Sequence, residues 1–281
     1  MIVLKGLTKK FGSLVAVNEL DMEIGQGELF GLLGPNGAGK TTTIRMLITL
    51  TKPTTGRISI NGYDFLEHSL AVKRQIGVVP QHLNLNKDLT AYQNLYFHGR
   101  FHKMPGTEIK SRATELLEYV GLIDRAGTRV EKFSEGMKRR LLIARALMHR
   151  PRILFMDEPT VGLDPQTRRR IWDLIRGMHQ GGVTILLTTH YIEEAEMLCE
   201  RVGVIDHGRL IELGSPGQIK KKVGEYTLEY FDEQQKTIRR FFPDRSAALE
   251  ETRKLSRDFE IRESNLEDVF IELTGHGIRD K

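Results

Sequence analysis

The sequence contains no segment long and apolar enough to cross a bilayer as a helix. A spanning helix needs about 20 mostly apolar residues, whereas each uninterrupted apolar run here ends after four residues or fewer. Residues 1–5 also lack the basic and apolar regions of a secretory signal. The single cysteine, Cys199, excludes an internal disulfide and suits a reducing compartment. We therefore expect a cytoplasmic protein.

The chain also has little net charge and no aromatic residues within its basic clusters, which limits the partners that composition can suggest. Lysine and arginine total 42 against 37 acidic residues, so the formal net charge is 42 − 37 = +5. Basic triplets occur at residues 138–140, 168–170 and 220–222, with no aromatic residue between them. Single-stranded nucleic acid is bound on basic grooves with stacking aromatic side chains, so we expect no nucleic-acid partner. We interpret the triplets as solvated faces, with contact to phosphate, a membrane surface or a partner as the alternative.

Hydrophobic residues make up 40% of the chain, which is enough for a buried core. Alternating apolar residues predict short strands over 2–4 and 14–17, continuing to Ile24, and these favour a small antiparallel layer. Later, apolar strands alternate with amphipathic helices, which predicts a largely parallel sheet covered on both faces. The predicted strands are 29–33, 153–156, 183–189 and 202–206, and the helices are about 40–50, 165–180 and 193–199.

A helical segment interrupts this alternation at about residues 87–151. Thr90 and Gln93 have the spacing of a capping box, Pro105 and Gly106 end that helix, and a further helix begins near Ser134. The segment stands between two predicted strands of one sheet. We therefore expect a helical subdomain inserted into the core of an α/β domain at residues 1–222.

The remaining residues, 223–281, are predicted to form a small α+β accessory domain. Strands are expected at 226–231 and 259–261, with a helix near 246–255 between them. A last helix follows, and Ser264 and Glu267 have the spacing of its capping box.

A phosphate-binding loop is predicted between the strand at 29–33 and the helix after it, in the run Gly34-Pro35-Asn36-Gly37-Ala38-Gly39-Lys40-Thr41. Glycines let backbone N–H groups turn inward around a β-phosphate, and the helix adds its positive N-terminal end. We expect Lys40 to span the β- and γ-phosphates and the Thr41 hydroxyl to ligate Mg²⁺. The sequence therefore predicts a nucleotide site.

A second part of that site is expected where the strand at 153–156 ends in two acids, Asp157 and Glu158. Adjacent side chains on a strand point in opposite directions, so one carboxylate can hold the metal while the other polarises water. We assign Asp157 to the metal and Glu158 to the attacking water as general base.

Five motifs in this order resemble those of ABC transporter ATPases, and the resemblance covers roughly residues 1–220. They are Gly34–Thr42, Ser134–Met137, Asp157–Thr160, Gly162–Asp164 and Thr189–His190. The resemblance implies a P-loop NTPase fold with a RecA-like parallel-sheet core and binding of ATP with Mg²⁺.

The resemblance also implies roles for residues whose type alone is uninformative. Phe11 is expected to stack on adenine, and Gln81 to sense the γ-phosphate and Mg²⁺. His190 is expected to contact the γ-phosphate, and Asp164 to communicate across a dimer.

Residues 134–137 resemble the family's signature loop, which caps the ATP held by the opposite subunit. Ser134 and Gly136 at a helix start offer a hydroxyl and free N–H groups to a γ-phosphate. Glu135 stands where the family has glycine, and Met137 stands where it has glutamine. A carboxylate beside a triphosphate is unfavourable unless it turns outward or pairs with Lys138 or Arg139. This departure puts the strength of ATP capture in doubt.

The segment from Ser264 to Gly275 resembles the C-terminal segment of ATPases from drug- and lipid-exporting systems of the ABC-2 type, such as the daunorubicin-resistance family. The resemblance therefore implies an ATP-hydrolysing transporter subunit. This segment alone favours export over import. It implies two partners, a second copy of the chain and a separately encoded membrane permease. The expected location is the cytoplasmic face of the membrane.

Two other functions remain open at this point. One is a soluble ABC-like ATPase acting on ribosomes or nucleic acid, although such relatives carry two cassettes or a long coiled coil and this chain has neither. The other is a nucleotide-gated scaffold with weak hydrolysis, which Glu135 makes conceivable.

Overall fold

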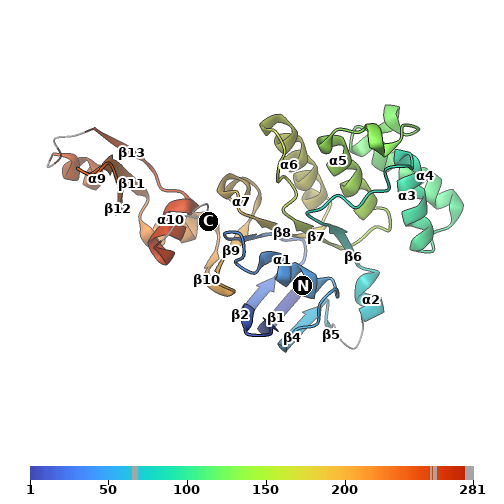
Figure 1. Ribbon diagram of the computed structural model, residues 1–281, viewed down its shortest axis with the longest axis horizontal. Helices are drawn as coiled ribbons and strands as arrows, with labels where there is room; N and C mark the ends of the chain where they lie inside the picture. The colour runs from blue at the N-terminus through green and yellow to red at the C-terminus, as the bar shows by residue number, and fades with distance from the viewer. Residues whose placement is uncertain (65–68, 254, 256–257, 276–281) are drawn as a thin grey trace.

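The computed structural model describes residues 1–64, 69–253, 255 and 258–275, and its centre is a six-stranded sheet (Figure 1). All neighbouring strands are parallel except the first two, which form an antiparallel hairpin. In spatial order the strands are β10 (Arg209–Gly214), β9 (Arg201–Asp206), β3 (Leu29–Leu33), β8 (Thr184–Thr189), β7 (Ile153–Asp157) and β6 (Ile76–Val79).

Both faces of this sheet are covered, as β3 illustrates. All five of its residues are buried. Leu29 and Leu33 pack into one hydrophobic cluster, among helices, while Phe30 and Leu32 pack into another, against the antiparallel strands. A continuous apolar strand of this kind is typical of a sheet with two covered faces. The predicted parallel sheet is therefore confirmed.

The predicted antiparallel layer is also present, and it is larger than the sequence indicated. Its strands, in spatial order, are β2 (Leu14–Ile24), β1 (Ile2–Phe11), β4 (Thr55–Ile60) and β5 (Tyr63–Asp64). β1 and β2 are long because their pairing continues through several register shifts to Phe11 and Leu14. β2 covers the predicted residues 14–24, whereas β1 extends beyond the predicted 2–4 through residues such as Lys5 and Lys10, which are exposed and break the apolar alternation.

The remaining helices of the core lie beside the central sheet. They are α1 (Lys40–Leu47), α2 (Ser69–Lys73), α6 (Pro165–Gln180), α7 (Ile192–Leu198) and α8 (Pro216–Val223). α6 spans the predicted residues and is capped by Asp164, whose Oδ1 accepts from Thr167 N at 2.9 Å. Within the residues that the structure describes, no helix combines the length and the apolar character needed to span a membrane.

Three helices form an arm between β6 and β7, in the segment where the sequence predicted a helical insertion. They are α3 (Ala91–Phe101), α4 (Gly106–Tyr119) and α5 (Glu135–Ala146), with two short 3-10 turns at Ile123–Arg125 and Val130–Lys132. The Thr90–Gln93 capping box is present, because Thr90 Oγ1 accepts from Gln93 N and Gln93 Oε1 accepts from Thr90 N. Ser134 caps α5, as predicted. We call residues 87–151 the helical arm.

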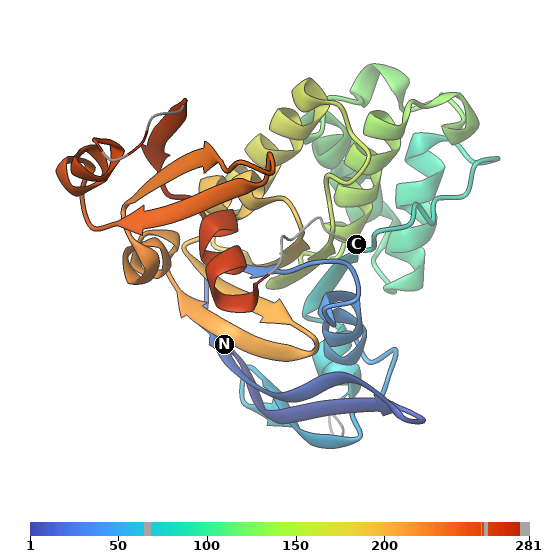
Figure 2. The same cartoon turned by 60° about the vertical axis from the view of Figure 1, so that its left-hand side comes forward.

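After α8 the chain forms a three-stranded antiparallel sheet with a helix on one side. The sheet order is β12 (Thr237–Phe242), β11 (Tyr226–Phe231) and β13 (Phe259–Glu263), and the helix is α9 (Arg245–Thr252). Figures 1 and 2 show this unit at the opposite end of the molecule from the helical arm. Residue 254 of the predicted helix and residues 276–281 of the predicted accessory domain lie outside the described residues.

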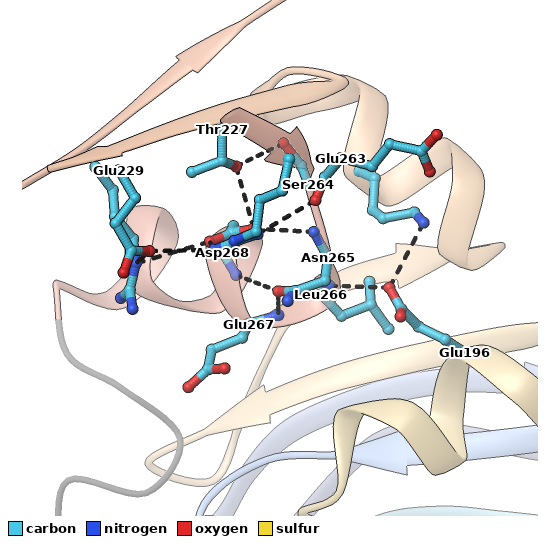
Figure 3. A network of polar contacts seen from close by, with 12 residues as sticks. Glu196, Thr227, Glu229, Glu263, Ser264, Asn265, Leu266, Glu267 and Asp268 are labelled. Carbon is cyan, nitrogen blue, oxygen red and sulfur yellow. Dashed lines mark hydrogen bonds and ion pairs between the residues drawn. The ribbon is translucent and has the colours of Figure 1, made fainter. Parts of the chain in front are cut away.

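The last helix, α10 (Leu266–Thr274), begins one residue later than a cap at Ser264 would require. Its capping box consists of Asn265 and Asp268, so the predicted Ser264–Glu267 pair is wrong. Ser264 is buried instead, and its hydroxyl lies 2.8 Å from that of Thr227 on β11 (Figure 3). An Asn cap and a Ser cap have similar intrinsic stability, so the tertiary contact of Ser264 decides between them.

Candidate functional site

The predicted phosphate loop joins the end of β3 to the start of α1, and close packing explains its glycines. Gly37 and Gly39 have φ of +82° and +107°, which side-chain-bearing residues rarely adopt. A Cβ at Gly34 would lie 2.2 Å from the Ile205 carbonyl oxygen, and one at Gly39 would lie 2.5 Å from that of Ala16. Packing therefore requires glycine at positions 34 and 39, and the backbone angle favours glycine at position 37. We call residues 34–41 the phosphate cradle.

The turn between β9 and β10 fastens the cradle to the antiparallel sheet. Gly208 N donates to the Ala38 carbonyl at 2.9 Å, and the Gly208 carbonyl accepts from Asn18 N at 2.8 Å. Gly208 has φ of +76°, and a Cβ there would lie 2.9 Å from the Ala16 carbonyl oxygen. Backbone from three separate elements is thus in direct contact around the cradle.

Positive charge is directed into the cradle from two sources. Gly39 caps α1 without a side-chain hydrogen bond, so the first N–H groups and the positive end of the helix face the loop. Lys40 is 4% exposed, and its Nζ donates to the carbonyls of Gly34 at 2.8 Å and Pro35 at 3.0 Å. Burial lowers the pKa of Lys40, and the charge of Glu158 opposes that decrease. The arrangement suits an anion such as a phosphate.

Asp157 ends β7 and is bound by hydroxyl groups from two neighbouring elements. Its Oδ1 accepts from Thr188 Oγ1 at 2.6 Å and from Thr41 Oγ1 at 3.2 Å. Thr188 lies on β8, and its hydroxyl also accepts from Glu158 N at 3.1 Å. The sequence analysis did not identify Thr188; its place on the strand next to β7 is the signal that could have revealed it. Asp157 and Thr41 are thus brought together, as predicted.

The Glu158 carboxylate lies at the centre of the predicted residues. Its Oε1 is 3.3 Å from Lys40 Nζ, and its Oε2 lies 3.3 Å from Gln81 Nε2 and 3.2 Å from His190 Nδ1. His190 Nδ1 and Glu158 Oε2 are within ion-pair distance, but they are not aligned as a hydrogen bond. Glu158 has φ of +47°, so its backbone turns sharply after the strand.

The ionisation of Glu158 follows from these neighbours. Burial alone would raise the pKa of its carboxyl group, but His190 and the positive charge of Lys40 outweigh burial and hold the pKa below its usual value. The carboxylate is therefore ionised at neutral pH. An ionised, half-enclosed carboxylate beside a phosphate cradle has the form required of a general base.

Arg139 belongs to the site's support, although the sequence analysis interpreted its basic triplet as a solvated face. Only 4% of Arg139 is exposed. Its Nη1 and Nη2 donate to the carbonyls of Pro80 and Gln81, both at 2.9 Å. That interpretation is therefore wrong for Arg139, because α5 turns its side chain inward to these carbonyls. Arg140 of the same triplet is partly buried as well, and its Nη1 donates to the carbonyls of Val120 and Gly121. Arg139 joins the helical arm to the Gln81 segment.

A cleft of about 520 Å³ opens at the cradle, and such a volume is typical of ligand sites. Phe11, half exposed, lies at its mouth with Lys9 Nζ 4.9 Å from the ring centre. The predicted residues that line the cleft are Phe11, Asn36, Gly37, Gly39, Lys40, Thr41, Thr42, Gln81 and Glu158. The lining residues that the sequence analysis missed are Leu14, Val15, Ala16 and His207. These come from the β1–β2 hairpin and the β9–β10 turn, and no motif marks either segment.

Gly34, Pro35 and Ala38 of the cradle do not line the cleft, and Asp157 and His190 reach it only through Thr41 and Glu158. Three further predicted residues lie apart from the cleft, the cradle and these contacts. Ser134 caps α5, with Oγ accepting from Met137 N at 3.3 Å, and Asp164 caps α6. Gly136 packs against α6 so closely that a Cβ would lie 2.5 Å from Thr167 Cγ2. The starts of α5 and α6 therefore adjoin each other, and within the described chain neither lines the cradle's cleft.

Glu135 turns away from the body of the protein. Its side chain is 66% exposed, and its Oε1 lies 2.7 Å from Lys138 Nζ. The carboxylate thus meets both conditions under which a negative charge is tolerated here, because it points outward and pairs with Lys138. It leaves the N-terminal end of α5 with a local ion pair instead of an unpaired negative charge.

Comparison with known proteins places these features in a family. The family model described as ABC transporter matches residues 17–161. The linearmycin resistance ATP-binding protein LnrL of Bacillus subtilis (strain 168) is 43% identical over 228 residues, covering 81% of this chain and 73% of that protein. A Nod factor export ATP-binding protein I of Cupriavidus metallidurans is 39% identical and covers 100% and 99%. The daunorubicin resistance ATP-binding protein DrrA3 of Streptomyces coeruleorubidus is 36% identical and covers 100% and 98%.

Solved structures agree with this result. A dimeric ATP-binding cassette, MJ0796, in a post-hydrolysis state with ADP and Pi bound, superposes with a TM-score of 0.70 at 31% identity. The match covers 76% of this chain and 98% of that one.

Proposed function

The chain belongs to the ABC transporter family, as the ATP-binding and ATP-hydrolysing subunit of a transporter. From this premise we propose that it powers export through a separately encoded membrane permease. The observation that carries the proposal is the position of Glu158, whose carboxylate lies between Lys40, Gln81 and His190 at the cradle. A cleft that grips phosphate and also holds an ionised carboxylate supports hydrolysis, beyond binding alone. Relatives named for Nod factor export and for drug resistance support the export direction.

ATP fits the residues that form the cleft. The cradle's backbone N–H groups and Lys40 receive the phosphates, and Phe11 offers an aromatic face for the base at the cleft mouth. Gly34, Pro35, Asn36, Gly37, Ala38, Gly39, Lys40, Thr41 and Thr42 form the phosphate contact in this proposal. Glu158 accepts a proton from the attacking water, and His190 holds the Glu158 carboxylate and reaches toward the terminal phosphate.

Mg²⁺ is the metal that suits the remaining donors. Thr41 Oγ1 and Asp157 Oδ1 are 3.2 Å apart, and the Gln81 side chain contacts Glu158 through Nε2 at 3.3 Å. Hydroxyl, carboxylate and amide oxygens are hard ligands of the kind that Mg²⁺ prefers. When bound, the ion neutralises negative charge on the phosphates. Thr188 keeps Asp157 in place for this role.

A second copy of the chain completes the site in our proposal. Ser134, Gly136 and Asp164 lie on adjoining helix starts away from the cleft. Ser134 and Gly136 offer a hydroxyl and backbone N–H groups, which suit a phosphate held by the opposite copy. Asp164 lies beside them, where it can communicate the state of that contact between the two copies. The dimeric solved cassette supports this arrangement.

We assign residues 1–222 to the ATPase domain, with the helical arm at about 87–151 inserted in it, and 223–281 to an accessory domain. The helical arm transmits ATP-driven motion to the permease, through which the subunit attaches to the cytoplasmic face of the membrane. The lack of a membrane-spanning helix among the described residues accords with a separate permease. Ribosomal or nucleic-acid targets and a weakly hydrolysing scaffold are less well supported, because the relatives are transporter subunits.

Glu158→Gln tests the proposal. Loss of the base is expected to lower ATP-dependent phosphate release by about 10²- to 10⁴-fold while ATP binding persists, so the variant should elute as an ATP-bound dimer in size-exclusion chromatography. Glu193→Gln, at an exposed site on α7, is the matched control and should hydrolyse ATP like the parent chain. Monomers of Glu158→Gln at saturating ATP would contradict the paired site.

A further inference from the structure

Three histidines gather where the helical arm returns to the central sheet. His98 and His102 lie four residues apart at the end of α3, so they share one side of the helix. His149 lies between the end of α5 and the start of β7. One ring nitrogen from each lies within 4.8 Å of those of the other two, and all three residues are partly buried. We call His98, His102 and His149 the histidine cluster.

The rings are already in mutual contact. Those of His102 and His149 are parallel within 9°, with centroids 3.8 Å apart. The His98 ring lies 4.7 Å from that of His102 and 5.9 Å from that of His149. The cluster is remote from the phosphate cradle in sequence and shares no residue with its cleft.

One nitrogen in the cluster is oriented as a metal ligand would be. His149 Nε2 lies 2.9 Å from the Ile76 carbonyl on β6, and a carbonyl only accepts, so Nε2 carries the proton. Nδ1 of His149 then carries a lone pair, and this buried atom has no hydrogen-bond partner in the described structure. Metal-binding histidines characteristically donate their other N–H to a carbonyl or carboxylate, which fixes the tautomer. Most buried polar atoms are hydrogen-bonded, so this unpaired acceptor is a position that a metal ion would satisfy.

The electrostatic surroundings keep the imidazoles uncharged. Burial, together with His102, Arg145 and His149, lowers the pKa of His98 to about 3, and burial with His149 lowers that of His102 to about 4. Burial also lowers the pKa of His149. Neutral imidazole is the form that binds metals. The positive charge of Arg145 opposes a second cation, but its guanidinium donates to the Asn84 carbonyl at 2.8 Å and is directed there.

We propose that the histidine cluster binds a transition-metal ion of the Zn²⁺ class, with water as the fourth ligand. Three imidazoles without carboxylates or thiolates suit Zn²⁺, Co²⁺, Ni²⁺ or Cu²⁺ over Mg²⁺ or Ca²⁺. Zn–N distances of about 2.0–2.1 Å place tetrahedral ligand atoms about 3.3 Å apart. The His102 ring therefore slides off the His149 stack when the ion binds.

A bound ion adds a polar link between parts of the chain that already share a hydrophobic cluster. His98 and His102 belong to the first helix of the helical arm, and His149 follows its last helix. His149 is also fastened to the edge strand β6 through Ile76. The ion thus joins both ends of the helical arm to the edge of the central sheet, and it stabilises the folded chain because the unfolded chain lacks the site.

Co²⁺ is the probe that tests the site, used on the full chain without a polyhistidine tag and without nucleotide. One Co²⁺ per chain should give the visible absorption of a four-coordinate ion, and Zn²⁺ should displace it. His102→Phe keeps an aromatic ring against His149 but removes a ligand, and His98→Gln removes another. Each should weaken Co²⁺ binding at least about tenfold. His179→Gln, on α6, is the matched control and should bind like the parent chain.

X-ray absorption at the zinc edge gives a second measurement that does not depend on variants. A shell of three nitrogen ligands at about 2.0–2.1 Å is expected. Circular dichroism and ATP binding verify that His102→Phe and His98→Gln are folded. The proposal is overturned if the parent chain binds no ion at severalfold molar excess, or if the two variants bind Co²⁺ as tightly as the parent.

Discussion

Arg139 shows how much of the site depends on a single side chain outside the cleft. Its guanidinium is buried, and burial lowers its pKa while the carboxylates of Glu135, Asp157 and Glu194 oppose that decrease. The charge is tolerated because the Pro80 and Gln81 carbonyls accept from it at 2.9 Å. Without the arginine those carbonyls would be left unpaired, and the segment that carries the Gln81 side chain would lose its anchor.

Arg139→Met should therefore destabilise the chain and slow catalysis together. Hydrogen bonds to charged groups contribute about 1.5–3 kcal/mol each, and unpaired carbonyls add to the cost, so a loss of about 3 kcal/mol in the free energy of unfolding is expected. The kcat for ATP should fall while the Kd for ATP changes little, since Arg139 does not line the cleft. Urea denaturation and phosphate-release assays measure the two effects.

Arg169→Ala is the control, because Arg169 belongs to another basic triplet and is exposed. It should change stability by no more than about 0.5 kcal/mol. Equal effects of the two substitutions would argue against an anchoring role for Arg139.

At the scale of elements, the starts of α5 and α6 are in close contact, so a destabilising substitution on one helix should be partly offset by a second substitution on the other. A Cβ at Gly136 would lie 2.5 Å from Thr167 Cγ2, so Gly136→Ala should cost about 1–3 kcal/mol through overpacking. Thr167→Ser removes that methyl group and should recover part of the loss in the double variant. Chemical denaturation of all four chains forms the double-mutant cycle. Strictly additive effects would mean that the two positions do not press on each other.

In the first turn of α10, the Asp268 carboxylate links the strands of the small sheet to the helix and its N-cap (Figure 3). Arg262 Nη1 and Nη2 donate to Asp268 Oδ2 at 2.6 Å and Oδ1 at 2.7 Å. Thr227 Oγ1 and Asn265 N also donate to Oδ2. Burial would raise the pKa of Asp268, but Arg262 and these donors outweigh burial and lower it. The carboxyl group is fully buried and ionised.

Asp268→Asn should destabilise the chain in a pH-dependent way. Breaking a buried ion pair costs about 3–5 kcal/mol at neutral pH. A depressed folded-state pKa contributes stability above the unfolded value of about 3.9 and loses it as pH falls through the folded value. The difference between parent and variant should therefore stay constant from about pH 7 to pH 5 and narrow below that. Urea unfolding at several pH values measures this.

Glu267→Gln, one residue earlier on the same turn, is the matched control for Asp268→Asn. It removes one negative charge near the helix N-terminus, which is worth only about 0.3–1 kcal/mol. A difference for Asp268→Asn that already narrows near pH 6 would assign the effect to another group.

These elements also show what the sequence can and cannot predict. The Thr90–Gln93 box was found because both members are local. The box at Ser264 failed because Ser264 and Asn265 are both good caps, and the contact of Ser264 with Thr227, distant in sequence, decides between them. β12 was missed because its residues, with Arg239 and Arg240 among them, lie on a small sheet where neither face is fully buried.

The same distinction applies to the site. Residues of the cradle and of the β7 end were predicted because their chemistry follows local motifs. Thr188 and Arg139 were not, because their importance arises from neighbours across the sheet and across the β6–α3 connection. The cleft wall at Leu14, Val15 and Ala16 carries no motif, since it presents only a hairpin surface.

At the scale of the whole molecule, the accessory unit and the ATPase core share one hydrophobic interior. Leu266, Val269 and Phe270 of α10 belong to the same buried cluster as Trp172 of α6 and the helical arm. Phe270 and Leu266 are fully buried. The two parts should therefore unfold together, although the three-stranded sheet projects from the body (Figure 2).

Phe270→Ala should shift the unfolding transition reported by the fluorescence of Trp172, the chain's one tryptophan. Truncating a buried phenylalanine costs about 3–5 kcal/mol. If α10 is part of the common core, Trp172 reports that cost although it lies on a different element. Leu249→Ala, at a half-exposed site on α9, is the control and should shift the transition little. An unchanged Trp172 transition in Phe270→Ala would mean that the accessory unit unfolds on its own.

The Gly208 turn has a consequence for which molecules the cleft can accept. It is bonded through its backbone to Ala38 of the cradle and to Asn18 of β2, so it links the cradle to the wall formed by the β1–β2 hairpin. The turn therefore helps to set the distance between Phe11, at one end of the cleft, and the phosphate cradle at the other. A nucleotide that contacts both ends must therefore span the distance that this turn helps to set.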